Sequence, residues 1–219
     1  LYGHPHLAEA DHWPRHAGRP MLLLCQIDLA SAPAPETLAP LPASGALRFF
    51  VAAGDDGEPL LDESFNPVAA KVLYVPRLAP DALDSLQELS QAPAAQPLTL
   101  IADAAQWPQL DAPNVGNLSW SPSQLDAYRH FLDSLLPEGP SPGHRLGGYP
   151  TVLQSNDLEF DAARVWPVSE PLAWRLLLQV DSDDVFMWGT DSGMLYFMIE
   201  TDALAARDFS RVVALTQGY

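Results

Sequence analysis

The sequence contains a single cysteine and few basic residues, and both scarcities narrow what the chain can be. Cys25 has no partner for an internal disulfide and lies within an apolar run, so we expect a buried, inert thiol. Lysine and arginine together number 11 against 28 acidic residues, which gives a net charge of −17. A chain with this charge repels phosphate backbones and anionic lipid surfaces, so we expect no nucleic-acid and no membrane binding.

Long apolar runs and several catalytic motifs are also missing. No apolar stretch approaches the roughly 18 residues that cross a bilayer, and no secretory signal opens the chain, so we expect a cytoplasmic protein. There is no Gly-x-Ser-x-Gly elbow, and residues 146–149 lack the third glycine and the lysine of a phosphate-binding loop. The sequence therefore identifies no catalytic residue and no cofactor.

What the chain does have is a strand-like pattern that occurs twice. Leu22–Asp28 returns as Arg175–Asp181, a Trp–Pro pair precedes each copy, and a glycine with a second apolar run follows each copy, at Gly45–Phe50 and Gly193–Met198. We predict a mainly β fold with minor helix (α+β), internally duplicated as two pseudosymmetric antiparallel β units. The whole chain, 1–219, is then one domain of two repeats, about 1–136 and 144–219, joined at 137–143.

The local patterns predict the elements of this fold. Alternating or continuous apolar runs predict strands over 21–29, 47–52, 71–75, 98–102, 172–180, 194–200 and 211–216. Apolar spacing and caps predict helices over 80–89, 121–136 and 201–207, with a turn at 55–57. In the best helix Ser121 is the N-cap and Gln124 completes a capping box.

The duplicated strand has one apolar face and one face that turns polar. Simple alternation places Leu23, Cys25 and Ile27 on a core face, and the matching residues of the second copy are Leu176, Leu178 and Val180. The other face ends in Gln26 and Asp28 in the first copy, and in Gln179 and Asp181 in the second.

These Gln/Asp pairs allow two interpretations. In the structural one, the side chains bind backbone groups of the following loop. In the functional one, Gln26, Asp28, Gln179 and Asp181 line a ligand cleft between the halves, where two carboxylates could raise each other's pKa. Trp188, which we expect near a surface groove, and Tyr149 complete the candidate ligand-binding residues.

Two groups of residues resemble metal sites, and neither has the required pattern. A helix–loop–helix calcium loop starting at Asp181 would need glycine and glutamate where the chain has Phe186 and Ser192. The histidines near the start are interrupted by Pro14, which prevents a helix from bringing His12 and His16 together. We therefore expect no metal site.

Several strings of the sequence resemble a known family. They are Leu146–Pro150 with Gln154, Leu176–Asp183, Trp188–Phe197, Asp208–Ser210 with Gln217, and, in the first half, Trp13–Pro14, Gln26–Leu29 and Gly45–Phe50. Together they resemble the YwqG-like family of bacterial proteins of unknown function. The resemblance implies a mainly β fold of the YwqG type and no assigned catalytic residues, while residues 79–143 match poorly.

Two function hypotheses follow from the sequence. The first is a non-enzymatic acidic module that binds a basic protein partner, in an accessory or immunity-like role. The alternative is a small-molecule-binding protein or a hydrolase-type enzyme that uses carboxylates in a cleft between the two repeats.

Overall fold

A computed structural model describes residues 13–33, 40–54, 59–60, 68–76, 94–102, 107–110, 112–135, 143–154, 158–166, 170–184, 187–188 and 192–218. The chain divides into two compact units. Unit 1 comprises Leu1–Ala102 and Asp202–Ala214, and unit 2 comprises Asp103–Thr201 and Leu215–Tyr219.

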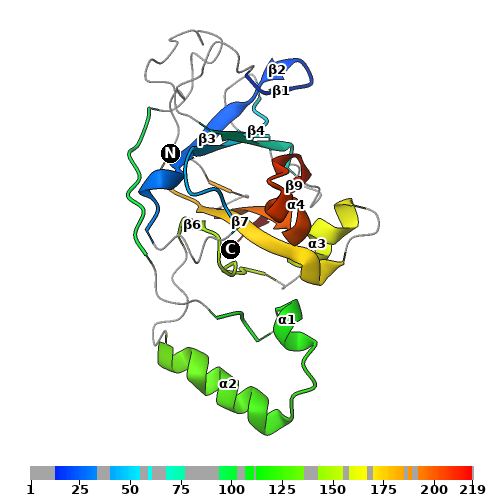
Figure 1. Ribbon diagram of the computed structural model, residues 1–219. Helices are drawn as coiled ribbons and strands as arrows, with labels where there is room; N and C mark the ends of the chain where they lie inside the picture. The colour runs from blue at the N-terminus through cyan, green and yellow to red at the C-terminus, as the bar shows by residue number, and fades with distance from the viewer. Residues whose placement is uncertain are drawn as a thin grey trace. The chain divides into compact units, whose positions relative to one another are not determined.

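Unit 1 is built on a three-stranded antiparallel sheet (Figure 1). Its strands are β3 (Leu22–Asp28), β4 (Ala46–Val51) and β5 (Ala70–Val75), in the order β3-β4-β5. The short strands β1 (Arg15–His16) and β2 (Arg19–Pro20) pair separately, and the 3-10 helix η1 (Leu29–Ser31) follows β3. The 3-10 helix η5 (Phe209–Arg211) packs on β5, with the ring centroids of Tyr74 and Phe209 6.2 Å apart.

The central strand β4 carries the core of unit 1, because all of its side chains are buried. On one side Met21, Leu23 and Phe50 form an apolar cluster, which is completed by the partly buried Trp13. The Trp13 and Phe50 rings meet edge to face at 5.3 Å, a geometry that aromatic pairs prefer.

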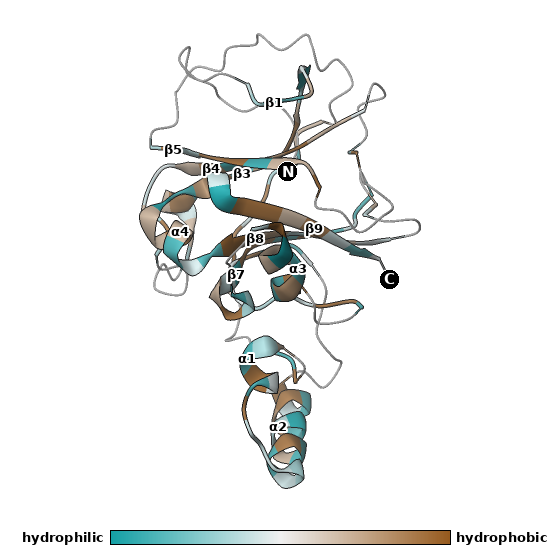
Figure 2. Ribbon diagram, turned by 90° about the vertical axis from the view of Figure 1, so that its right-hand side faces the viewer, coloured by the Kyte–Doolittle hydropathy of each residue, from teal (hydrophilic) through white to brown (hydrophobic). Residues whose placement is uncertain are grey.

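Unit 2 is built on a four-stranded sheet in the order β6-β7-β8-β9. The strands are β6 (Arg145–Leu146), β7 (Trp174–Asp181), β8 (Gly193–Glu200) and β9 (Val212–Gly218), and β9 begins among the residues of unit 1. Helix α3 (Leu158–Val165) packs on β7, β8 and the 3-10 helix η4 (Pro171–Ala173), and α1 (Pro113–Gly116) contacts η4. Helix α2 (Pro122–Leu135) also belongs to unit 2, and it alternates hydrophobic and hydrophilic colours along its length (Figure 2). Helix α4 (Thr201–Ala206) belongs to unit 1 from Asp202 onward.

The two strand pairs β3–β4 and β7–β8 share one register and one irregularity. Gln26 lies opposite Arg48 in the first pair, and Gln179 lies opposite Tyr196 in the second. A bulge falls at Leu24 in β3 and at Leu177 in β7, the same place in the repeated sequence. The N–H of Leu29 donates to the Gly45 carbonyl at 2.9 Å, and the N–H of Ser182 donates to the Gly193 carbonyl at 3.0 Å. An internal duplication would produce these matched features, and the duplication itself stays a prediction.

The bulge corrects the predicted assignment of faces. Leu23 pairs with Phe50 and Cys25 with Phe49, and neighbouring residues of β4 point to opposite faces. Leu23 therefore shares a face with Gln26, and not with Cys25 and Ile27 as simple alternation predicts. The same shift separates Leu176 from Leu178 in β7, where both faces are buried from Leu176 to Val180.

The predicted mainly β fold with minor helix is confirmed, as is the capped helix. The Ser121 N–H donates to Gln124 Oε1 at 2.9 Å and the Gln124 N–H donates to Ser121 Oγ at 3.4 Å, which are the two bonds of the expected capping box. The strand predicted over 98–102 is wrong, since this stretch has no regular structure and Ile101 is 80% exposed. The helix predicted over 80–89 and the turn at 55–57 lie outside the described residues. Within the described residues, no helix has the length and apolar character needed to cross a membrane.

Candidate functional site

In unit 2, polar side chains of the sheet bind the segment 143–154. The Oε1 atom of Gln179, a residue with 0% exposure, accepts from the Thr151 N–H at 2.8 Å, and its Nε2 donates to the Gly143 carbonyl at 2.8 Å. Arg145 adds an Nη1 bond of 2.9 Å to the Thr151 hydroxyl. Side chains of β6 and β7 thus hold the segment that contains Gly148, Tyr149 and Pro150, by hydrogen bonds to its backbone and to the Thr151 hydroxyl.

The next two strands hold the same segment further along. The Tyr196 hydroxyl donates to the Thr151 carbonyl at 2.7 Å. Gln217 Oε1 accepts from the Leu153 N–H at 2.9 Å, and both residues of the sheet are buried. The network therefore fixes the shape of the loop that carries Tyr149.

In unit 1, Gln26 binds a side chain instead of the backbone. Its Oε1 accepts from Arg48 Nε at 2.8 Å, and Arg48 is 0% exposed. Asp28 caps η1, because its Oδ1 accepts from the Ala30 N–H at 3.0 Å. An amide beside a buried guanidinium offsets part of the cost of removing that charge from water.

The Ser182 hydroxyl makes most of the side-chain hydrogen bonds that shape the loop after β7. Asp181 accepts from the Ser182 N–H at 2.8 Å. The Ser182 hydroxyl accepts from the N–H groups of Trp188 and Gly193, both at 2.9 Å, and donates to the Gly193 carbonyl at 2.9 Å. The serine thereby closes the turn between β7 and β8.

Trp188 does not occupy the surface groove that the sequence predicts. It is 0% exposed, and its indole N–H donates to the Asp181 carbonyl at 3.2 Å. The glycine and acidic residues around Trp188 in the sequence favour an exposed position, but the structure buries the ring. Trp107, in contrast, is 50% exposed.

The predicted candidates thus fall into two places. Gln26 and Asp28 belong to unit 1, whereas Tyr149, Gln179, Asp181 and Trp188 belong to unit 2. Asp28, Gln179 and Asp181 bind backbone groups, as the structural interpretation expects. A shared ligand cleft between the halves stays a prediction.

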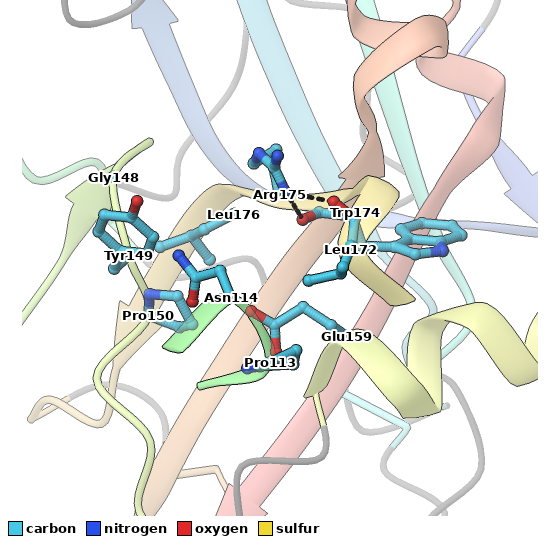
Figure 3. A pocket seen from close by; sticks show the side chains of 10 residues that line it. All are labelled: Pro113, Asn114, Gly148, Tyr149, Pro150, Glu159, Leu172, Trp174, Arg175 and Leu176. Atoms are coloured by element: carbon cyan, nitrogen blue, oxygen red, sulfur yellow. Dashed lines mark hydrogen bonds between the residues drawn. The ribbon is translucent and has the colours of Figure 1, made fainter. Parts of the chain in front are cut away.

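Tyr149 lines a pocket that the sequence does not predict. The pocket lies among α1, residues 148–150, α3, η4 and the start of β7, and its cavity volume is about 20 Å³, which is room for about one water molecule. Its polar side chains are Asn114, Tyr149, Glu159 and Arg175 (Figure 3). The remaining walls are apolar, which is the usual make-up of a ligand pocket.

The charges in this pocket differ in how far they are engaged. Arg175 Nη1 donates to the carbonyls of Leu172 and Trp174, both at 2.7 Å. Burial raises the pKa of the Glu159 carboxyl, while its own backbone N–H and the Arg175 charge lower it. The pocket therefore contains a half-buried carboxylate beside a charged guanidinium, which donates to two backbone carbonyls through Nη1.

A second feature, the aromatic face of α2, consists of Trp107, Trp120, Tyr128 and Phe131. The Trp107 and Phe131 rings meet edge to face at 5.1 Å, and the Tyr128 hydroxyl donates to the Pro108 carbonyl at 2.8 Å. No side chain of α2 is buried. Phe131 is 37% exposed and Leu135 is 44% exposed, so this helix presents apolar surface to solvent.

A comparison with family models identifies the chain's relatives. A model described as a domain of unknown function, DUF1963, matches residues 1–217. The chain belongs to DUF1963. A search of curated proteins finds no match for this DUF1963 chain. The match covers nearly the whole length of the chain and assigns no activity to the site.

The described part of this DUF1963 chain holds no group of three His, Cys, Asp or Glu side chains that could bind a metal ion. His4, His6 and His12 lie outside the described residues, and His16 lies in the exposed β1–β2 hairpin. Glu159 was not predicted, because a single glutamate in a short amphipathic helix gives no signal in the sequence. The aromatic face could have been found from Trp107, Trp120, Tyr128 and Phe131, whose spacing follows the predicted helix and its flanks.

Proposed function

We propose that this DUF1963 chain is a non-enzymatic acidic module that binds a basic protein through the aromatic face of α2. The exposure of Trp107 and Phe131 is the observation that carries the proposal. Aromatic residues supply most of the binding energy in many interfaces, because they bury a large area with few rotatable bonds.

The environment of the helix supports this role. Leu118, which precedes α2, and Leu135, at its end, are also exposed apolar residues, at 47% and 44%. An amphipathic helix normally buries its apolar stripe against the core of its own domain. A helix with no buried side chain leaves that stripe available for another chain.

Charge supports the choice of a basic partner. The chain has a net charge of −17, and α2 itself carries Asp126 and Asp133. Arg129 is paired with Asp126 at 2.7 Å, so the helix offers no unbalanced positive charge. Opposite fields accelerate the encounter of two proteins, and this acceleration weakens as salt screens the charges.

The experiment is a capture assay with the immobilised chain and a lysate of the source organism, followed by identification of what is bound. We expect one basic protein, whose capture decreases as salt increases from about 0.05 M to about 0.5 M. Trp107→Ala and Phe131→Ala should each weaken its capture at least about tenfold. Leu60→Ala is the control, because Leu60 is a similarly exposed apolar residue, at 47%, in unit 1.

Capture that ignores both salt and the two aromatic substitutions would contradict the proposal. Circular dichroism of each variant tests that the fold is kept, which we expect because the substituted side chains are exposed. An accessory or immunity-like role, the likeness to YwqG-like bacterial proteins and a cytoplasmic location stay predictions alongside it.

The alternative function, a small-molecule site or hydrolase-type centre formed by Gln26, Asp28, Gln179 and Asp181, has weaker support. Three of these side chains are occupied by backbone groups. Thermal-shift screening of metabolites tests the alternative, which requires a ligand that stabilises the wild type and not Asp181→Asn.

A further inference from the structure

Another pocket, which lies within unit 1, is large enough to hold a small molecule. Its cavity volume is about 310 Å³, which is within the range of ligand pockets. One wall is the β1–β2 hairpin, and the other is formed by the chain that follows β4. The described residues that line the pocket are His16, Ala17, Arg19, Pro20, Ala53 and Leu60.

The hairpin brings the two basic side chains of this pocket together. His16 lies directly opposite Arg19 in the antiparallel pair of β1 and β2. Opposite residues of such a pair project from the same face, with Cβ atoms roughly 5 Å apart. On the other wall, the Leu60 N–H donates to the Ala52 carbonyl at 2.8 Å, which ties this wall to the end of β4. Both walls are therefore fixed by backbone pairing.

The polar groups of this pocket favour an anionic ligand. None of its described lining residues is acidic, although the chain has 28 acidic residues. The guanidinium of Arg19 has several N–H donors and no acceptor, so it can bind a ligand in addition to its contacts within the protein. A ring N–H of His16 is a further donor in either protonation state. Hydrogen bonds from a guanidinium are strongest when the acceptor is charged.

The charge of the whole chain opposes an anion, and distance decides which effect is larger. A net charge of −17 repels anions in solution. At physiological ionic strength salt screens such charges over about 8 Å. An anion inside the pocket would instead be in direct contact with the guanidinium, where screening is weakest. The local donors therefore outweigh the more distant carboxylates.

The rest of the pocket suits a hydrocarbon tail on the anion. Pro20, Ala53 and Leu60 provide apolar walls, and Leu60 is 47% exposed. A tail placed against Leu60 would remove this apolar surface from water, which favours binding. The two oxygens of a carboxylate match the planar fork of a guanidinium. A carboxylate head with a short apolar tail thus satisfies both parts of the pocket.

We propose that this pocket binds a small organic carboxylate, with Arg19 as its bidentate partner and His16 as a further donor. Pro20, Ala53 and Leu60 cover the hydrocarbon tail. The site belongs to unit 1, whereas the aromatic face of α2 belongs to unit 2. The carboxylate site therefore does not depend on the proposed protein binding.

Nuclear magnetic resonance of the isotope-labelled chain tests the site with three probes at constant pH and ionic strength. These are hexanoate, neutral 1-hexanol and inorganic phosphate. With hexanoate we expect saturable shifts of the His16 and Arg19 backbone amides and of the Leu60 methyl groups, with a dissociation constant on the order of millimolar. 1-Hexanol lacks the charge and phosphate lacks the tail, so each should bind at least about tenfold more weakly.

One pair of substitutions tests the guanidinium. Arg19→Gln removes the charge and the fork of donors, and it should weaken hexanoate binding at least about tenfold. Arg164→Gln is the control, because it makes the same change of charge at an exposed position in unit 2. Its affinity for hexanoate should stay within about twofold of the wild type.

A second pair of substitutions tests the apolar wall with side chains of nearly equal size. Leu60→Asp places a carboxylate against the ligand, whereas Leu60→Asn differs from it only in charge. Both variants should fold, because the Leu60 side chain is exposed, and their amide spectra verify this. We expect Leu60→Asp to bind hexanoate at least about fivefold more weakly than Leu60→Asn, because like charges repel.

The proposal is overturned if hexanoate gives no saturable shifts in the pocket, or if 1-hexanol or phosphate binds as tightly as hexanoate. It is also overturned if Arg19→Gln and Arg164→Gln behave alike, or if Leu60→Asp and Leu60→Asn bind hexanoate equally.

Discussion

The side-chain oxygen of Gln179 accepts a hydrogen bond from the backbone N–H of Thr151 at 2.8 Å. The nitrogen of the same amide donates to the Gly143 carbonyl at 2.8 Å. One fully buried side chain of β7 therefore joins both ends of the segment 143–151 to the sheet. This segment carries Tyr149 into the pocket, so the stability of the site depends on a residue that is not part of its lining.

Replacing Gln179 with leucine should destabilise the chain, because the Thr151 N–H and the Gly143 carbonyl lose their partner. A buried polar group left without a hydrogen bond costs roughly 1–3 kcal/mol. We expect Gln179→Leu to lower the free energy of unfolding in urea by about 2–4 kcal/mol. The control is Gln154→Leu, an exposed position where we expect a change of less than about 0.5 kcal/mol. Equal stabilities of the two variants would show that the amide does not hold the segment.

The turn before β8 should tolerate no side chain at Gly193. A Cβ atom there would clash with the carbonyl oxygens of Trp188 and Gln217, which are backbone atoms that cannot move independently. We expect Gly193→Ala to lower the melting temperature by at least about 10 °C or to prevent folding. At Gly218 the nearest atom to an added Cβ is the Ser192 carbonyl oxygen at 3.6 Å, an ordinary contact.

Gly218→Ala is therefore the matched control, and its melting temperature should stay within about 3 °C of the wild type. Scanning calorimetry of both variants measures the difference. A Gly193→Ala chain as stable as the Gly218→Ala chain would mean that Trp188 and Gln217 do not approach this position closely.

The strands are predicted well because each one is encoded by neighbouring residues of the sequence. The candidate site is predicted poorly because its residues are far apart in the sequence. The apolar run Met194–Ile199, for example, predicts a strand, and the structure buries it on both faces. The bulges at Leu24 and Leu177 give no such signal, so alternation placed Leu23 and Cys25 on one face when they lie on opposite faces.

The candidate pocket illustrates the same limit. Its polar residues Asn114, Tyr149, Glu159 and Arg175 come from four separate segments, and only the folded chain brings them together. α3 itself has a short, weakly apolar sequence, and its position on β7 and β8 is fixed by tertiary packing. Of the predicted candidate residues, Tyr149 alone lines this pocket. The sequence around Tyr149 does not indicate which residues the side chain faces.

Cys25 should resist thiol reagents as long as the chain is folded. It is 1% exposed, and burial raises the pKa of its thiol to about 12, so the thiolate that reacts is scarce at neutral pH. We expect a chromogenic disulfide reagent to label Cys25 only as urea unfolds the chain, with the labelling midpoint equal to that of the fluorescence transition. Rapid labelling without denaturant would contradict the buried position of the thiol in β3.

The stability of unit 2 should fall as His144 gains a proton. Although His144 is exposed as a residue, its Nδ1 accepts from the Asp181 N–H at 3.2 Å, and a protonated Nδ1 cannot accept. Burial of the ring lowers the pKa of His144, and the nearby Asp183 and Asp181 oppose that shift only in part. A folded pKa below the ordinary value means that the stabilisation is complete above the unfolded pKa and is lost as pH falls through the folded pKa.

The measurement compares the wild type with His144→Asn, whose side-chain oxygen can accept without titrating. Between about pH 7.5 and about pH 5 the wild type should lose more unfolding free energy than the variant, by less than about 1 kcal/mol because solvent screens the site. Urea denaturation at each pH gives the two curves. Parallel curves would mean that Asp181 and Asp183 hold the protonated ring as strongly as the backbone N–H holds the neutral ring, and a wild type that gains stability relative to His144→Asn as pH falls would mean that they hold it more strongly.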